Sequence, residues 1–273
     1  MDKILKEAHQ WMHEYMHSFH CDDKDIMFGI KMKEMHTGYV TANARELADY
    51  LKLDQHQVML AELIGLLHDV GRFRQWQLYK TFVDKLSEDH ADLGVKTIRE
   101  MPFFGQMAAR DQELVLFAIG NHNKKDIAQT EDKEKLLFAK IIRDADKLDI
   151  FRVLSPYLTQ DNQGENQSPA IKKFMQGPTG SAEGKGVFAP GFLEDFVAGR
   201  QVDYAKIQTN EDRKLVRLMW VYDINFTWTL CHVVAKGYID AIIANLPQNP
   251  QVELGVKKLR EYITNKCNNL DVV

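Results

Sequence analysis

Apolar residues recur every three or four positions along most of the chain, which is the pattern of amphipathic helices. The segments 40–51, 60–67, 114–119 and 136–153 follow it clearly. We expect the last of these helices to end near Ser155–Pro156, because proline disfavours helical backbone at the residue before it. Apolar and polar residues nowhere alternate between hairpin turns in this sequence. The pattern therefore predicts an all-α protein.

The composition changes over residues 157–191, which are rich in Gly, Pro, Ser, Asn and Gln. This segment is predicted to be a loop or a lid. Residues 1–156 before it are predicted to form an amino-terminal helix and a helical core. Residues 192–273 are predicted to be an appended helical region packed on that core, with helical segments over about 211–245 and 250–265.

Several residues with metal-binding side chains lie where the apolar faces continue. Helical spacing places His36, His68 and Asp146 on the inward faces of three separate helices. His90 and His122 follow apolar residues at the same spacing. A single inward histidine is more often a core residue bonded to a backbone carbonyl. A buried carboxylate, however, needs a cation or strong hydrogen bonds, and a divalent metal held by imidazole and carboxylate satisfies the whole set.

The local sequence around these residues carries a resemblance to a known family. His36 is followed by LLHDVGRF, which contains His68 and Asp69, and later by DADKL, which contains Asp146. This order, H…HD…D, resembles the HD superfamily of metal-dependent phosphohydrolases. The resemblance implies an HD-domain helical bundle in which these four residues bind a metal. It favours Asp146 over Asp144 as the last ligand, because Asp146 precedes a Lys-Leu pair as the family's ligand precedes its basic-Leu pair.

Two further segments are similar to the binuclear HD-GYP branches of that family. The segment EDHADLG contains His90, and GNHNKKD contains His122, although an asparagine stands where those branches have one of two paired histidines. The resemblance implies that both histidines bind a second ion or contact the substrate; otherwise they are interior histidines. Asp69 would then bridge the two ions. We expect one ion, or two if His90 and His122 also bind, chosen from Mn, Fe, Co, Ni, Zn and Mg.

Asp69, Arg72 and Lys147 are the expected catalytic residues. Arg72 stands where the HD-GYP branch has a lysine, and it could contact a phosphate or form an ion pair with Asp69. Lys147 follows Asp146 directly and is the second candidate for a phosphate contact. The resemblance implies a phosphohydrolase that acts on a nucleotide or other small phosphate ester by attack of a metal-bound water. An HD-fold di-iron oxygenase and a non-catalytic metal- or nucleotide-binding signalling module are the alternatives.

Composition narrows the class of protein and its partners. Of the 273 residues, 45% are hydrophobic and 27% are charged, which is typical of a globular protein. The net charge of -4 argues against a nucleic-acid polymer as partner and does not exclude a small anionic substrate. The resemblance alone implies a small phosphorylated substrate, in the first instance a nucleotide. Three cysteines without a CxxC pair, no apolar signal segment at the start and no long apolar run predict a cytoplasmic protein without a membrane partner. The sequence indicates no oligomeric state.

Overall fold

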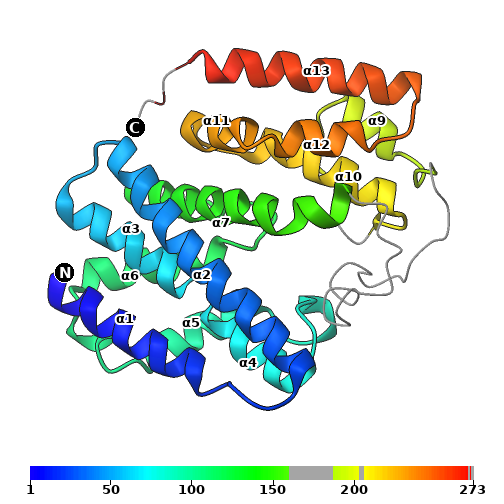
Figure 1. Ribbon diagram of the computed structural model, residues 1–273. Coiled ribbons are helices and arrows are strands. Elements are labelled where there is room, and N and C mark those ends of the chain that lie inside the picture. The colour runs from blue at the N-terminus through cyan, green and yellow to red at the C-terminus, as the bar shows by residue number, and fades with distance from the viewer. Residues whose placement is uncertain (160–186, 203–205, 270, 272–273) are drawn as a thin grey trace. The chain divides into compact units, whose positions relative to one another are not determined.

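The computed structural model describes residues 1–159, 187–202, 206–269 and 271. Within these residues the regular secondary structure is entirely helical, which confirms the all-α prediction (Figure 1). The chain divides into two compact units, and the division falls between Asp149 and Ile150. No helix in the described part of the chain combines the length and the apolar character that crossing a bilayer requires.

In the residues that the structure describes, the first unit contains six helices and the greater part of a seventh, with two short 3-10 helices between them. They are α1 (Asp2–His17), α2 (Lys24–Tyr50), α3 (Gln55–Leu67), α4 (Val70–Tyr79), η1 (Asp84–Leu86), α5 (His90–Arg99), η2 (Phe104–Gln106), α6 (Ala109–Asn121) and α7 (Lys133–Thr159). Side chains start several of them: Asp54 forms a capping box with Gln57 at α3, and Asp89 accepts hydrogen bonds from the first backbone N–H groups of α5.

Helices α2 and α3 form the centre of this unit. Helix α2 packs on α3 and α4, α3 also packs on α1 and α6, and α5 joins α4 to α6 (Figure 1). The faces in contact are apolar, with Leu47, Leu63 and Ile64 at most 1% exposed. Burial of such side chains contributes about 1.5–3 kcal/mol each to folding. Because α2 and α3 bury these faces together, His36 on α2 and His68 at the end of α3 are carried into the same interior.

The first half of helix α7 is held against the other helices of the first unit by hydrogen bonds from two side chains. Asn43 on α2 donates to the carbonyl oxygen of Ala145 at 3.2 Å. Arg143 is 6% exposed and donates to the carbonyl oxygens of Asn121 and Lys124 after α6. These bonds fix the rotation of α7 around the positions of Asp144 and Asp146.

The second unit contains the helices of the carboxyl-terminal part. Its described helices after α7 are α9 (Phe192–Val197), α10 (Asn210–Met219), η4 (Trp220–Asp223), α11 (Thr227–Ala235), α12 (Tyr238–Ala244) and α13 (Pro250–Cys267). Helix α13 packs on α9 and α11, while α10 packs on α9 and α12. Phe151, in the part of α7 that belongs to this unit, stacks near Tyr238 with ring centroids 6.4 Å apart.

The predicted helical segment 211–245 is broken into four pieces. Ile224 has an extended backbone, with φ -76° and ψ 125°, and Gly237 has a positive φ of 73°. The carboxylate of Asp271 accepts hydrogen bonds from the backbone N–H groups of Thr227 and Trp228 at the start of α11. The first N–H groups of a helix have no partner within it. Because Asp271 accepts from them here, the break at Ile224 leaves no hydrogen bond of these two groups unmade.

The predicted end of α7 at Ser155–Pro156 is wrong, because the helix continues to Thr159. Proline lacks an N–H group, but near a helix end it removes only one helical hydrogen bond. Leu154 and Leu158, four residues apart, are 2% and 5% exposed, so burial on one face offsets the loss. The predicted loop or lid lies outside the described residues over 160–186, and the domain boundaries and the packing of 192–273 on the core stay predictions.

Candidate metal centre

His68 and Asp69 lie at the junction of two helices, and not inside one helix as the apolar pattern predicts. Helix α3 ends at Leu67, and Asp69 precedes α4 with φ -105° and ψ 17°. Adjacent residues of a continuous helix point about 100° apart and do not face one another. The non-helical backbone at Asp69 lets both side chains turn to the same centre, where His68 Nε2 lies 3.5 Å from Asp69 Oδ2.

The four residues of the H…HD…D pattern converge on one point. The Nε2 atoms of His36 and His68 are 3.3 Å apart. His36 Nε2 lies 3.5 Å from Asp69 Oδ2 and 3.1 Å from Asp146 Oδ1, and His68 Nε2 lies 3.9 Å from the same Asp146 oxygen. We call this donor set position A. Helix α2, the α3–α4 junction and α7 supply these four residues.

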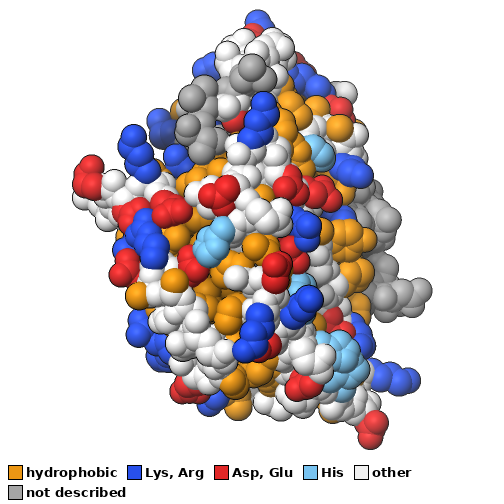
Figure 2. Space-filling model, turned by 90° about the vertical axis from the view of Figure 1, so that its left-hand side faces the viewer, with side chains coloured by type: hydrophobic (Ala, Val, Ile, Leu, Met, Phe, Trp, Pro, Cys, Tyr) orange, Lys and Arg blue, Asp and Glu red, His pale blue; other side chains and the backbone are white. Residues whose placement is uncertain are grey.

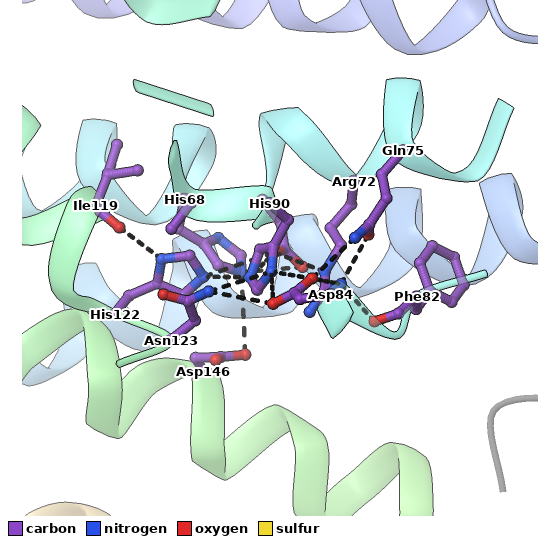
Figure 3. A network of polar contacts seen from close by, with 12 residues as sticks. His68, Arg72, Gln75, Phe82, Asp84, His90, Ile119, His122, Asn123 and Asp146 are labelled. Atoms are coloured by element: carbon purple, nitrogen blue, oxygen red, sulfur yellow. Dashed lines mark hydrogen bonds and ion pairs between the residues drawn. The ribbon is translucent and has the colours of Figure 1, made fainter. Parts of the chain in front are cut away.

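A second donor set lies on the other side of Asp69. His90 is the first residue of α5 and His122 follows the last residue of α6. Their Nε2 atoms are 3.0 Å apart, and they lie 3.4 Å and 3.7 Å from Asp69 Oδ1. We call Asp69, His90 and His122 position B; Figure 3 shows the two histidines side by side. The two positions use different oxygens of one carboxylate, as expected for a residue that bridges two ions.

Backbone carbonyls orient one histidine in each position. His68 Nδ1 donates to the carbonyl oxygen of Gly65 at 2.7 Å, and His122 Nδ1 donates to that of Ile119 at 2.7 Å. A carbonyl oxygen only accepts, so the proton of each neutral ring is on Nδ1. The Nε2 lone pair is then directed at the centre, which is the arrangement found in metal-binding histidines.

Carboxylates orient the other two histidines. His36 Nδ1 is 2.6 Å from Asp149 Oδ2, three residues beyond Asp146 on α7. His90 Nδ1 is 2.8 Å and 2.9 Å from the two oxygens of Asp84 on η1. A carboxylate behind a ligating imidazole fixes the ring and raises its basicity.

The donor atoms of both positions fit a divalent cation. In each position, two imidazole nitrogens and an oxygen of the buried Asp69 carboxylate lie within 4.8 Å of one another. Nitrogen lone pairs that face each other beside a carboxylate repel unless a positive charge lies between them. Imidazole and carboxylate together suit Zn and the transition metals from Mn to Ni. The sets are therefore chemically suited to hold ions and are poorly explained as core packing.

The charges around Asp69 keep it ionised. Burial would raise its pKa, but Lys33, whose Nζ is 2.6 Å from Oδ2, and His68 hold that pKa well below the usual value. Burial would likewise raise the pKa of Asp146, and the hydrogen bond from His36 is the main effect that holds it below the usual value. Both carboxylates are thus present as anions that can bind a cation.

The two carboxylate-supported histidines differ in protonation. Burial and the charge of Lys33 would lower the pKa of His36, yet hydrogen bonds to Asp146, Asp149 and Asp69 raise it to about 10. For His90, burial and the charge of Arg72 lower the pKa to about 3. The His90 ring is therefore neutral at physiological pH and suited to bind a metal, whereas the His36 ring carries a proton that a bound metal would have to displace.

Gly71 allows α5 to approach the junction that carries Asp69. A Cβ atom built on Gly71 would lie 2.3 Å from the carbonyl oxygen of His90 and 2.8 Å from the backbone nitrogen of Gly94. Any side chain would therefore push α5, and His90 with it, away from Asp69. The glycine of the HDVG segment thus determines the geometry of position B.

The catalytic roles predicted for the two basic residues stay predictions. Arg72 Nη1 donates to Gln75, to the carbonyl oxygen of Phe82 and to Asp84 at 2.7–2.9 Å, while its Nε lies 3.6 Å from Asp69 Oδ1. Its guanidinium therefore holds the segment before α5 and also faces the centre. Lys147 is 8% exposed on α7.

Three residues of the centre were not found from the sequence. Lys33 and Asp149 each lie three residues from a predicted ligand on the same helix, so helical spacing could have indicated them. Asp84 lies on a three-residue 3-10 helix, and no periodic pattern identifies it.

Asp146 and Asp144 can be separated by experiment. Asp146 contacts the position A histidines, whereas Asp144 is fully buried on another side of α7. We expect Asp146→Asn to weaken metal binding at position A at least about tenfold, as measured by calorimetric titration of the metal-free protein with Mn²⁺. Asp144→Asn is the matched variant. Loss of metal binding in Asp144→Asn alone would reverse the assignment.

Comparison with known proteins gives one match. The family model of the HD domain matches residues 34–150, a range that contains all six predicted metal ligands. No curated protein and no solved structure matches the chain. The HD family is typically one of metal-dependent phosphohydrolases, and the clusters of His and Asp described above fit its metal site. Residues 34–150 of this chain are therefore similar to the HD domain both in sequence and in the His and Asp residues that they bring together.

Proposed function

We propose that the protein is a metal-dependent phosphohydrolase that cleaves a nucleotide or another small phosphate ester at a centre of two divalent ions bridged by Asp69. The observation that carries this proposal is the pair of donor sets that face opposite oxygens of one buried carboxylate. A bridged pair of ions is the common arrangement for displacement at phosphorus. The expectation of a single ion is thereby replaced by a proposal of two.

Bound divalent ions polarise a phosphoryl oxygen and make water acidic enough to supply hydroxide near neutral pH. The residues of the chain provide the geometry and the remaining charges. Both oxygens of Asp69 face imidazole nitrogens, so we assign Asp69 to holding the ions and not to accepting a proton. Lys33 and Arg72 place positive charges 2.6 Å and 3.6 Å from this carboxylate. They are the cations of the chain that would stabilise negative charge on a phosphoryl group.

The surface supports a small substrate over a polymer. On the face shown in Figure 2, acidic and basic side chains are interspersed and do not form one extended basic area. Proteins that bind nucleic acid along its phosphate backbone usually gather lysine and arginine on one face. With a net charge of -4, positive potential from bound ions is then the local attraction for an anionic substrate.

Elemental analysis and a substrate panel test this proposal. We expect the purified protein to contain a transition metal and to hydrolyse phosphomonoesters, nucleotides or phosphodiesters when Mn²⁺, Co²⁺ or Ni²⁺ is added. Chelation should abolish hydrolysis, and returning the metal should restore it. A protein that holds no metal under any of these conditions would contradict the proposal.

Two other outcomes would assign a different function. Two irons with a mixed-valence spectrum and no phosphatase activity would indicate a di-iron oxygenase, whose ligands are also His and Asp. Tight nucleotide binding with no product formed would indicate a signalling module. The intact set of His36, His68, Asp69 and Asp146, whose side chains lie together at position A, favours turnover over such a module.

A further inference from the structure

The histidines of the two candidate metal positions are oriented in the same way, but the two positions differ in the number of donor residues. Each contains one histidine oriented by a backbone carbonyl and one oriented by a carboxylate: Asp149 behind His36 in position A, and Asp84 behind His90 in position B. Position A has four donor residues of the chain, and position B has three, including the shared Asp69. An ion at position B therefore depends more on each of its histidines.

The supporting carboxylates lie in different surroundings. The Asp149 side chain is 1% exposed and lies within the long helix α7. The Asp84 side chain is 29% exposed and lies on η1, which has three residues. Asp84 is thus the more accessible of the two supports, and it is carried by the shorter element.

A set of side chains holds Asp84 in place behind His90 (Figure 3). Arg72 Nη1 donates to Asp84 Oδ1 at 2.9 Å, Gln75 Nε2 donates to the same oxygen at 2.8 Å, and Asn123 Nδ2 donates to Oδ2 at 3.2 Å. Gln75 is fully buried, so the network is part of the interior. These donors and His90 Nδ1 together engage both oxygens of the carboxylate, so Asp84 is held where it supports the histidine. Asp84, Asp89 and His90 also lie close enough to hold a cation, but the hydrogen bond from the ring is the contact on which the inference below rests.

We propose that Asp84 is the positioning residue of position B, and that position B holds its ion more weakly than position A, so that loading of position B sets the activity. This proposal rests on the proposed two-ion hydrolase. The hydrogen bond from His90 Nδ1 to Asp84 keeps the Nε2 lone pair directed at Asp69 and His122. Without the carboxylate, the ring can rotate or carry its proton on Nε2, and either change removes one of three donors.

Calorimetric titration of the metal-free, full-length protein with Mn²⁺ tests the proposal. We expect two binding steps in the wild type. Asp84→Asn should weaken the second step about tenfold to a hundredfold and leave the first unchanged. Asp149→Asn should weaken the first step instead. In assays, Asp84→Asn should need correspondingly more Mn²⁺ for half-maximal activity but approach the wild-type kcat at saturating Mn²⁺, which a merely structural defect would not allow.

Asp89→Asn is the matched control. Asp89 lies five residues from Asp84 and caps α5 through backbone N–H groups of Ala91 and Asp92, a role that asparagine also fills. The variant removes the same charge near His90 without removing a bond to its ring. If Asp89→Asn weakens the second step as much as Asp84→Asn, or if Asp84→Asn changes neither step, the positioning role is wrong. A wild type that binds no Mn²⁺ contradicts the proposed function itself, and one that binds a single ion and hydrolyses contradicts the two-ion centre.

Discussion

Replacing Asp69 with asparagine is expected to abolish hydrolysis and binding at both metal positions together. Asp69 is the one residue that faces both donor sets, with Oδ2 toward His36 and His68 and Oδ1 toward His90 and His122. An amide is neutral and offers one oxygen, so it cannot bridge two cations. We expect kcat/KM to fall by about a thousandfold or more, equivalent to about 4 kcal/mol of transition-state stabilisation. Metal content by elemental analysis and hydrolysis of the best substrate measure both effects.

A second buried aspartate provides the control for this variant. Asp111 on α6 is 6% exposed and pairs with His56 at 2.9 Å, away from either donor set. Asp111→Asn should keep metal and activity, even if it lowers the melting temperature. An Asp69→Asn protein that folds, keeps two ions per chain and hydrolyses at the wild-type rate would show that the bridging carboxylate is not the basis of the centre.

The sequence predicts which residues lie at the centre better than it predicts the backbone structure around them. Helical spacing predicts inward positions for His36, His68 and Asp146, and an ionisable residue on such a face needs a partner. Asp69, and the assignment of all four residues as metal ligands, come from the resemblance to the HD superfamily. His90 and His122 followed the same spacing. The structure brings all six predicted ligands together in two sets. Helical periodicity is a local property, so it survives in a single sequence and indicates what points inward.

The features that the sequence does not predict depend on packing that no periodic pattern reveals. Asp84 is on a short 3-10 helix, and its role follows only from the position of His90 six residues later. The apolar pattern runs through His68 and Asp69 without a proline or a turn signal and so predicts a continuous helix, whereas α3 ends at Leu67 and α4 begins at Val70. Pro156 was read as a helix end, although burial of Leu158 sustains one more turn. In each case, tertiary packing outweighs the local preference of the chain.

Gly71→Ala is expected to have the largest effect on folding among single substitutions near the centre. The added methyl group would lie 2.3 Å from the His90 carbonyl oxygen, and this is backbone that cannot rotate away. Alanine favours helix over glycine by about 1 kcal/mol, but a clash of this kind costs about 1–3 kcal/mol, and more when backbone must move. The clash should dominate. We expect a lower melting temperature by circular dichroism, by about 5–10 °C, and loss of the second Mn²⁺ binding step as α5 moves His90 away from Asp69.

Gly94→Ala separates this explanation from a general intolerance of the α4–α5 contact. Gly94 faces Gly71 across the same contact, yet a Cβ atom there would lie 3.5 Å from Val70 Cγ1 and 3.7 Å from the Gly71 nitrogen, which are ordinary contact distances. The substitution should be neutral or stabilising by up to about 1 kcal/mol, since it replaces a glycine within a helix. Two glycines in one contact are thus expected to respond oppositely to the same methyl group. If both variants melt alike and both keep two Mn²⁺ steps, the close approach of α5 at Gly71 does not determine position B.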